Sequence, residues 1–126
     1  MSEQVQGVVV SHGDLAAGLV GAVADITGNN AALRAISNKE CSATTLQQRI
    51  AEAVGSRPSV IFVDLPHGSC LQAAALQMRK LPNISVVSGV NLAMLVDFVY
   101  HSEATPREAA ARAVEKGLSS VQPLNP

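Results

Sequence analysis

The stretch VVVSHGD at residues 8–14 decides the fold of this chain. Its three valines form a continuous β-branched run, which is typical of a strand buried on both faces of a parallel sheet. Apolar side chains then recur at steps of three and four between Asp14 and Gly28, which predicts a helix with Asp14 as its N-cap and Gly28 just past its end. We therefore expect His12 in the turn between a buried strand and a helix.

This position makes His12 a candidate functional residue. Open α/β sheets bind their ligands at the carboxyl ends of the strands, where this turn lies. The free amides and positive dipole end of a helix start favour an anionic group such as phosphate. The alternative is a loop histidine without any chemical role.

Strand and helix patterns alternate through the rest of the chain. Apolar runs predict further strands over 33–36, 59–65 and 84–87, and helical periodicity lies between them. This alternation predicts a single α/β domain over residues 1–126: three layers, with a doubly wound, mainly parallel sheet of about four strands and helices on both faces.

Polar residues and glycines mark the expected helix ends. Ser69 with Gln72 has the pattern of a capping box, and Asn91 and Thr105 are expected to cap the last two helices. Gly117 is expected to end the final helix. Residues 118–124 then suggest a short extra strand, which Pro123 would confine to a sheet edge and which hints at a partner subunit.

Composition excludes several classes of function. The 126 residues carry a net charge of −1 with no Lys/Arg run, two Phe, one Tyr and no Trp, so a nucleic-acid ligand is not expected. No apolar stretch approaches the roughly 20 residues that span a bilayer, and we expect no signal peptide. The two cysteines, Cys41 and Cys70, lack CxxC spacing and fit free thiols in a reducing cytoplasm.

The common nucleotide and hydrolase motifs are missing. Gly13 and Gly18 have the outer spacing of a Walker A loop, but Leu19 and Val20 stand where Lys and Ser/Thr are required. GxGxxG and GxSxG are absent, which argues against a dinucleotide site and an α/β-hydrolase.

Asp64 ends a predicted strand at the same sheet edge as His12. A carboxylate there can accept a hydrogen bond from one ring nitrogen of His12, fix its tautomer and leave the other nitrogen as a nucleophile. A solvated or turn-capping carboxylate is the alternative. The amides of Gly68 and Ser69 and the Ser69 hydroxyl would form an anion-accepting helix start beside them, although Ser69 also suits a purely structural cap.

A metal site is a less favoured hypothesis. His12, Asp64 and His67 together offer imidazole and carboxylate ligands. No HExxH motif or His/Cys cluster supports such a site, so no metal is expected. Cys70 is interpreted as a small core residue.

Three segments resemble one family. Residues 8–19, VVVSHGDLAAGL, are similar to the N-terminal active-site segment of mannose/fructose/sorbose-class phosphotransferase-system (PTS) IIA domains. Val63-Asp64-Leu65 with Gly68-Ser69 resembles the family's Asp-containing motif, and residues 88–95, SGVNLAML, resemble its Gly-Val-Asn-Leu-Pro-Met-Leu signature. The three segments occur in the family's order and at similar spacing over essentially the whole chain.

The resemblance implies a cytoplasmic histidine phosphocarrier. His12 would accept a phosphoryl group from the carrier protein HPr and pass it to a separate IIB protein, so contact with the membrane would be indirect, through IIC and IID components. Asp64 would orient His12, and Gly13, Gly68 and Ser69 would hold the phosphate. The family also implies a homodimer that exchanges its last strand, and no metal or organic cofactor.

The chain departs from the family in one loop. The family usually has an aromatic or apolar residue and then Gly-Gly-Ser-Pro where this chain has Pro66-His67-Gly68-Ser69-Cys70, so His67 replaces a glycine and is a candidate modulator of the site. Two alternatives stay open: a regulatory module whose partner affinity changes when His12 is phosphorylated, and the phosphotransfer subunit of a dihydroxyacetone kinase.

Overall fold

The computed structural model describes residues 4–101 and 104–125, and in this part of the chain strands and helices alternate as expected. The strands are β1 (Gln6–Ser11), β2 (Leu33–Ser37), β3 (Ser59–Val63) and β4 (Ile84–Ser88). The helices are α1 (Leu15–Thr27), α2 (Ala43–Val54), α3 (Ser69–Lys80), α4 (Leu92–Tyr100) and α5 (Pro106–Ser119).

The four strands form one parallel sheet in the order β2-β1-β3-β4. β1 therefore has β2 on one side and β3 on the other, and the direction of winding reverses between them. Open parallel sheets bind ligands at such a reversal, outside the carboxyl ends of the strands, which here are those of β1 and β3. The predicted α/β fold with a parallel sheet is confirmed.

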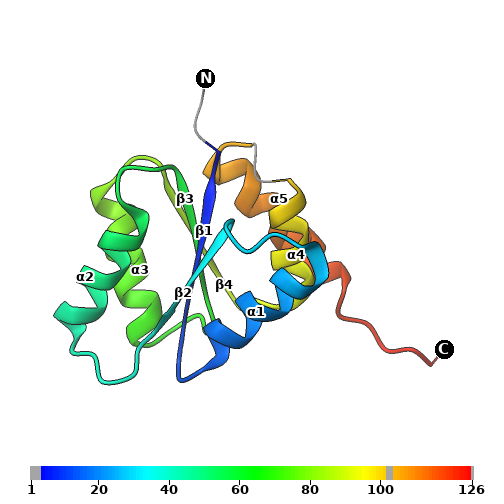
Figure 1. Cartoon of the computed structure of the whole chain (residues 1–126), viewed down its shortest axis with the longest axis horizontal. Coiled ribbons are helices and arrows are strands. Elements are labelled where there is room, and N and C mark those ends of the chain that lie inside the picture. The colour runs from blue at the N-terminus through cyan, green and yellow to red at the C-terminus, as the bar shows by residue number, and fades with distance from the viewer. Residues whose placement is uncertain (1–3, 102–103, 126) are drawn as a thin grey trace.

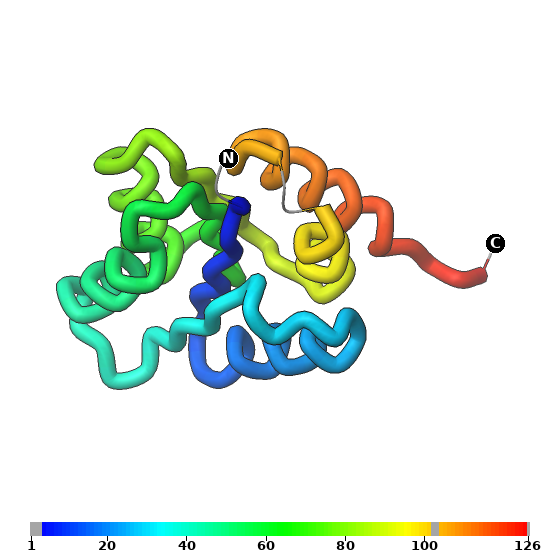
Figure 2. Tube along the Cα trace, turned by 45° about the horizontal axis from the view of Figure 1, so that its top comes forward, coloured from blue at the N-terminus to red at the C-terminus, as the bar shows by residue number. Residues whose placement is uncertain are grey.

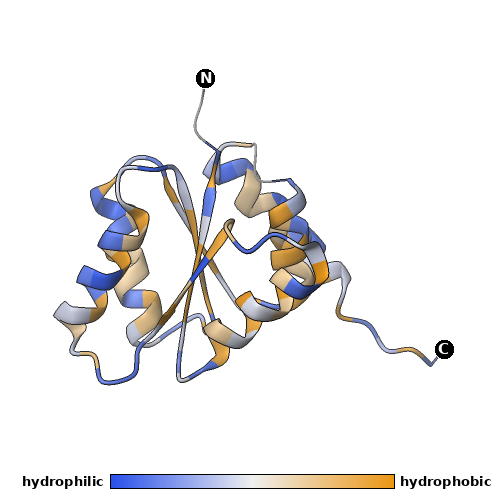
Figure 3. Ribbon diagram, viewed as in Figure 1, coloured by the Kyte–Doolittle hydropathy of each residue, from blue (hydrophilic) through white to orange (hydrophobic). Residues whose placement is uncertain are grey.

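Helices cover both faces of the sheet. Figures 1 and 2 show α2 and α3 on one face and α1, α4 and α5 on the other. Side chains of β1 alternate between the two resulting cores, with Val9 packed in one and Val8 and Val10 in the other. Figure 3 shows apolar residues gathered on the strands and on the helix sides that face them. The sheet is thus buried on both faces, which explains the unbroken valine run.

The N-caps of α4 and α5 are confirmed. The Asn91 side chain accepts a hydrogen bond from the Met94 amide at 3.0 Å, and the Thr105 hydroxyl accepts one from the Glu108 amide at 3.2 Å. Gly28 ends α1 in the left-handed conformation, also as expected.

Two other caps differ from the prediction. Asp14 makes no capping bond; its carboxylate pairs with Lys39, and the Ser11 hydroxyl accepts the Ala16 amide at 2.7 Å instead. Ser69 is the first residue of α3 and not its cap, because Gly68 occupies the N-cap and its carbonyl accepts the Gln72 amide. The Ser69–Gln72 capping box is therefore absent.

Gly117 does not end α5, which continues to Ser119. The glycine is buried, and a Cβ at this position would lie 2.6 Å from the Met94 Cε. Its role is to let α5 approach α4 closely.

Of the extra strand predicted over residues 118–124, residues 118–119 belong to α5, and residues 120–125 form no strand in the single chain. The carboxyl-terminal tail leaves the end of α5 and projects from the body of the single chain (Figure 1). The exchanged edge strand stays a prediction. Among residues 4–101 and 104–125, no helix combines the length and apolar character needed to cross a membrane.

Candidate functional site

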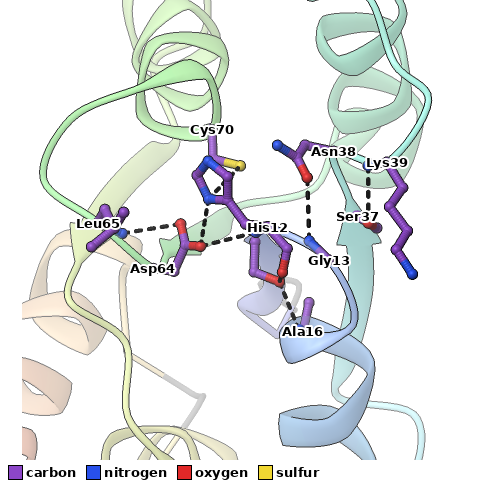
Figure 4. Close-up of polar contacts among 10 residues, drawn as sticks. His12, Gly13, Ala16, Ser37, Asn38, Lys39, Asp64, Leu65 and Cys70 are labelled. Atoms are coloured by element: carbon purple, nitrogen blue, oxygen red, sulfur yellow. Dashed lines mark hydrogen bonds and ion pairs between the residues drawn. The ribbon is translucent and has the colours of Figure 1, made fainter.

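His12 and Asp64 follow directly after neighbouring strands, β1 and β3. Val10 and Val63 are partners in the register of this strand pair, so the two polar residues emerge side by side at the carboxyl edge. The His12 Nδ1 lies 2.7 Å from the Asp64 Oδ2, and the His12 backbone amide donates to the same oxygen at 2.9 Å (Figure 4). The structure thus brings the two residues into the contact expected from the sequence.

Asp64 is ionised at neutral pH. Burial raises its pKa, but the hydrogen bonds from the amide and ring of His12, with the ring's charge, outweigh burial and hold the pKa of Asp64 below its usual value. An ionised carboxylate accepts hydrogen bonds only, so the His12 Nδ1 carries the proton in this contact. The lone pair of a neutral His12 ring then lies on Nε2.

The two side chains differ in exposure. The His12 side chain is 47% exposed, whereas that of Asp64 is 9% exposed. The Asp64 carboxylate is therefore enclosed by protein, whereas the His12 ring is open to a partner molecule from solvent.

Cys70 is the third side chain at this point. Its Sγ lies 3.9 Å from the His12 Nδ1, and the residue is 1% exposed. Burial and the negative charge of Asp64 raise the pKa of the Cys70 thiol, so it is protonated at neutral pH. Cys70 belongs to the core between the sheet and α3, as expected, but it also touches the histidine, which the sequence did not reveal.

The start of α3 adjoins the His12 ring, because Cys70 is its second residue. Gly68 is the N-cap with φ 94° and ψ −172°, a conformation open essentially to glycine alone. No side chain caps this helix, so its first amides lack an acceptor within the helix or from a cap. Ser69 is exposed, and no hydrogen bond joins it to His12 or Asp64 among the described contacts.

Gly13 has φ 58° and donates its amide to the Asn38 Oδ1 at 3.3 Å. Asn38 follows β2 and completes the same sheet edge (Figure 4). Sequence reasoning missed Asn38. The available signal was its place two residues after the strand predicted over 33–36, at the carboxyl edge of the expected sheet.

His67 lies in the exposed loop before α3, and none of the described hydrogen bonds or ion pairs involves it. Its φ is not positive, so the histidine replaces the family's glycine without entering the left-handed region. The structure does not bring His67 together with His12 and Asp64 as a metal-ligand group. The group that could hold a metal ion is instead His12, Asp64 and Cys70, whose donor atoms lie within 4.8 Å of one another.

Comparisons with known proteins agree with this geometry. A family model described as the PTS system fructose IIA component, mannose-type, matches residues 6–115. The mannose/sorbose-specific IIA subunit of Enterococcus faecalis has a TM-score of 0.86 and 25% identity, with 98% of this chain and 97% of that chain covered. A search of curated proteins gave no significant match.

Two further solved structures share the fold. The PTS component EIIA of Streptococcus agalactiae has a TM-score of 0.86 at 17% identity, and the match covers 94% of this chain and 96% of that chain. The PTS IIA protein associated with the fucose utilisation operon of Streptococcus pneumoniae has a TM-score of 0.81 at 19% identity, covering 98% and 95%. Because the family match spans most of the sequence and the fold agrees, the chain belongs to the mannose/fructose-type IIA family of the PTS.

Proposed function

We propose that this protein is a cytoplasmic phosphocarrier that takes a phosphoryl group from the phosphohistidine of HPr onto the His12 Nε2 and passes it to a separate IIB protein. The observation that carries the proposal is the contact between the His12 Nδ1 and the Asp64 Oδ2 at 2.7 Å. This contact places the lone pair of a neutral His12 ring on Nε2. Family membership supplies the class of reaction.

Transfer between two histidines needs little covalent machinery. The Nε2 lone pair of His12 attacks phosphorus, the P–N bond of the donor breaks, and its electron pair returns to the donor ring. Such transfers pass through a loose transition state and depend mainly on positioning and electrostatic stabilisation. Positive charge develops on the His12 ring during attack, and the buried Asp64 carboxylate stabilises it.

The start of α3 is our candidate for holding the phosphoryl oxygens. Its uncapped first amides and the positive end of the helix dipole favour an anion next to His12. Gly68 provides the backbone conformation that begins this turn, and the exposed Ser69 hydroxyl can add a hydrogen bond. The Gly13 amide would have to give up its 3.3 Å hydrogen bond to the Asn38 Oδ1 in order to donate to a phosphate oxygen.

We also propose that the functional unit is a homodimer. β4 is an edge of the sheet, with β3 as its partner in the single chain. The tail carries Val121 and Leu124, which are 76% and 98% exposed. An exchanged strand would cover both the open edge and these apolar side chains.

The test is phosphorylation by phosphoenolpyruvate, Enzyme I and HPr. The wild-type protein should form an acid-labile, alkali-stable adduct, and His12→Ala should form none. His67→Ala is the matched control, because it removes a neighbouring exposed histidine and should leave labelling intact. Labelling of His12→Ala at the wild-type level would overturn the assignment. Subsequent addition of IIB proteins separates a relay, which loses its label, from a regulatory module, which keeps it.

A further inference from the structure

Three metal-ligating side chains of different chemistry meet where β1, β3 and α3 converge. The His12 Nδ1 lies 2.7 Å from the Asp64 Oδ2 and 3.9 Å from the Cys70 Sγ. All three donor atoms lie within 4.8 Å of one another. His12 and Asp64 directly follow β1 and β3 and Cys70 lies in α3, so three separate segments of the chain provide the cluster.

Two of the distances between these atoms are close to those in a tetrahedral zinc site, and the third, from the Asp64 Oδ2 to the Cys70 Sγ, is at most 4.8 Å. Zinc bond lengths to nitrogen, oxygen and sulfur of about 2.0–2.3 Å imply donor–donor distances of roughly 3.4–3.6 Å. The His12–Asp64 pair would open by roughly 0.7 Å and Cys70 would approach the ring by about 0.3 Å to reach these values. Rotation of the exposed His12 ring can provide most of this change.

We propose that His12, Asp64 and Cys70 bind one Zn²⁺ ion, with the fourth position open to water. Imidazole, carboxylate and thiolate together favour zinc over magnesium or calcium, which prefer oxygen ligands alone. Cys70 is buried and the Asp64 side chain is 9% exposed, so two of the three donors are largely shielded from competing water. The ion enters from the exposed side of the His12 ring.

Zinc binding and phosphorylation of His12 exclude each other. Coordination by Nδ1 moves the ring proton to Nε2, and coordination by sulfur releases the thiol proton of Cys70 to solvent. One proton therefore leaves for each ion bound, and Nε2 no longer has a lone pair for attack on phosphorus. This regulatory consequence rests on the proposed function, whereas the binding of zinc does not.

Titration with Co²⁺ and Zn²⁺ under reducing conditions tests the binding. Co²⁺ bound to the wild-type protein should give a sulfur-to-metal charge-transfer band at one ion per chain, and excess Zn²⁺ should remove it. Cys70→Ala should lose the band and weaken binding by at least the about 10- to 100-fold that loss of an outer-shell partner costs. Cys41→Ala is the matched control, since it removes the other thiol and should keep the band.

Absence of the band in the wild-type protein would overturn the proposal, as would a band that survives in Cys70→Ala and disappears in Cys41→Ala. The wild-type spectrum decides the question even where a variant folds poorly, which circular dichroism would reveal.

A second measurement separates this proposal from the proposed function. Zn²⁺ should slow phosphorylation of the wild-type protein by HPr and affect Cys70→Ala much less in the same mixture. Phosphorylation that proceeds with no Co²⁺ band refutes the metal site alone. A Co²⁺ band without phosphorylation in metal-free buffer refutes the phosphocarrier alone.

Discussion

One oxygen of Asp64, Oδ2, accepts hydrogen bonds from both the backbone amide and the ring of His12, at 2.9 and 2.7 Å. The hydrogen bond from the backbone amide holds the end of β1 next to the end of β3. The hydrogen bond from the ring sets the orientation of the imidazole. Because both residues leave buried strands, the geometry of the pair is set by the sheet. Such preorganisation is what a positioning-dependent transfer requires.

Asp64→Asn should keep the fold and slow phosphorylation of His12. The amide is nearly the same size as the carboxylate but carries no charge to stabilise the ring during attack, so we expect a loss of about 10²-fold or more in rate. Rapid-quench phosphorylation by HPr measures the effect. Asp25→Asn, which removes an exposed carboxylate of α1, is the control and should leave the rate unchanged. An unchanged rate in Asp64→Asn would contradict the role of Asp64.

The same pair predicts how stability depends on pH. The folded-state pKa of Asp64 lies below its ordinary value, because the hydrogen bonds from His12 outweigh burial. Its contribution to the free energy of unfolding is therefore fully present above the unfolded pKa and is lost as the pH falls through the folded one. Urea unfolding should show the stability difference between wild type and Asp64→Asn shrinking over that acidic range. A difference that stays constant would contradict the prediction.

The fold could be predicted from the sequence because burial on both faces leaves a strong pattern. The run 8–10 and the alternation of strands with helices are properties of local sequence, and they were sufficient to predict the parallel sheet and the contact of His12 with Asp64. The helix ends were less predictable. The Ala16 amide donates to the Ser11 hydroxyl and not to the Asp14 carboxylate. The N-cap of α3 is Gly68, one residue before the predicted Ser69.

Asn38 and Cys70 show why the rest of the site could not be predicted. Each is ordinary in its own segment, one polar residue after a strand and one small apolar residue in a helix. Whether they belong to the site depends on which helices and strands become neighbours in the fold. Only the order of β2 beside β1, and the packing of α3 behind the strand ends, brings them to Gly13 and His12.

Gly117→Ala should destabilise the protein. The new Cβ would lie 2.6 Å from the Met94 Cε, which can rotate away, but also 3.2 Å from the Met94 Cβ and 3.3 Å from the Asn91 Oδ1, the atom that caps α4. Overpacking costs about 1–3 kcal/mol, which exceeds the gain of up to about 1 kcal/mol from replacing a helical glycine. Gly21→Ala in α1 meets nothing within 4 Å and should instead stabilise the protein. Thermal unfolding compares the two, and a stabilised Gly117→Ala would show that α4 and α5 are not tightly packed there.

Removal of residues 120–126 should convert a dimer into monomers while α5, which ends at Ser119, stays complete. The single chain leaves one edge of β4 without a partner strand. It also leaves apolar side chains of the tail in solvent, because Val121 and Leu124 are 76% and 98% exposed. Identical tails exchanged across a two-fold axis would satisfy both at once. Val121→Asp should weaken the dimer in the full-length chain, and Ala51→Asp, which adds the same charge to the exposed side of α2, should not. Light scattering at micromolar concentration decides the matter, because a monomeric full-length protein would rule out the exchange.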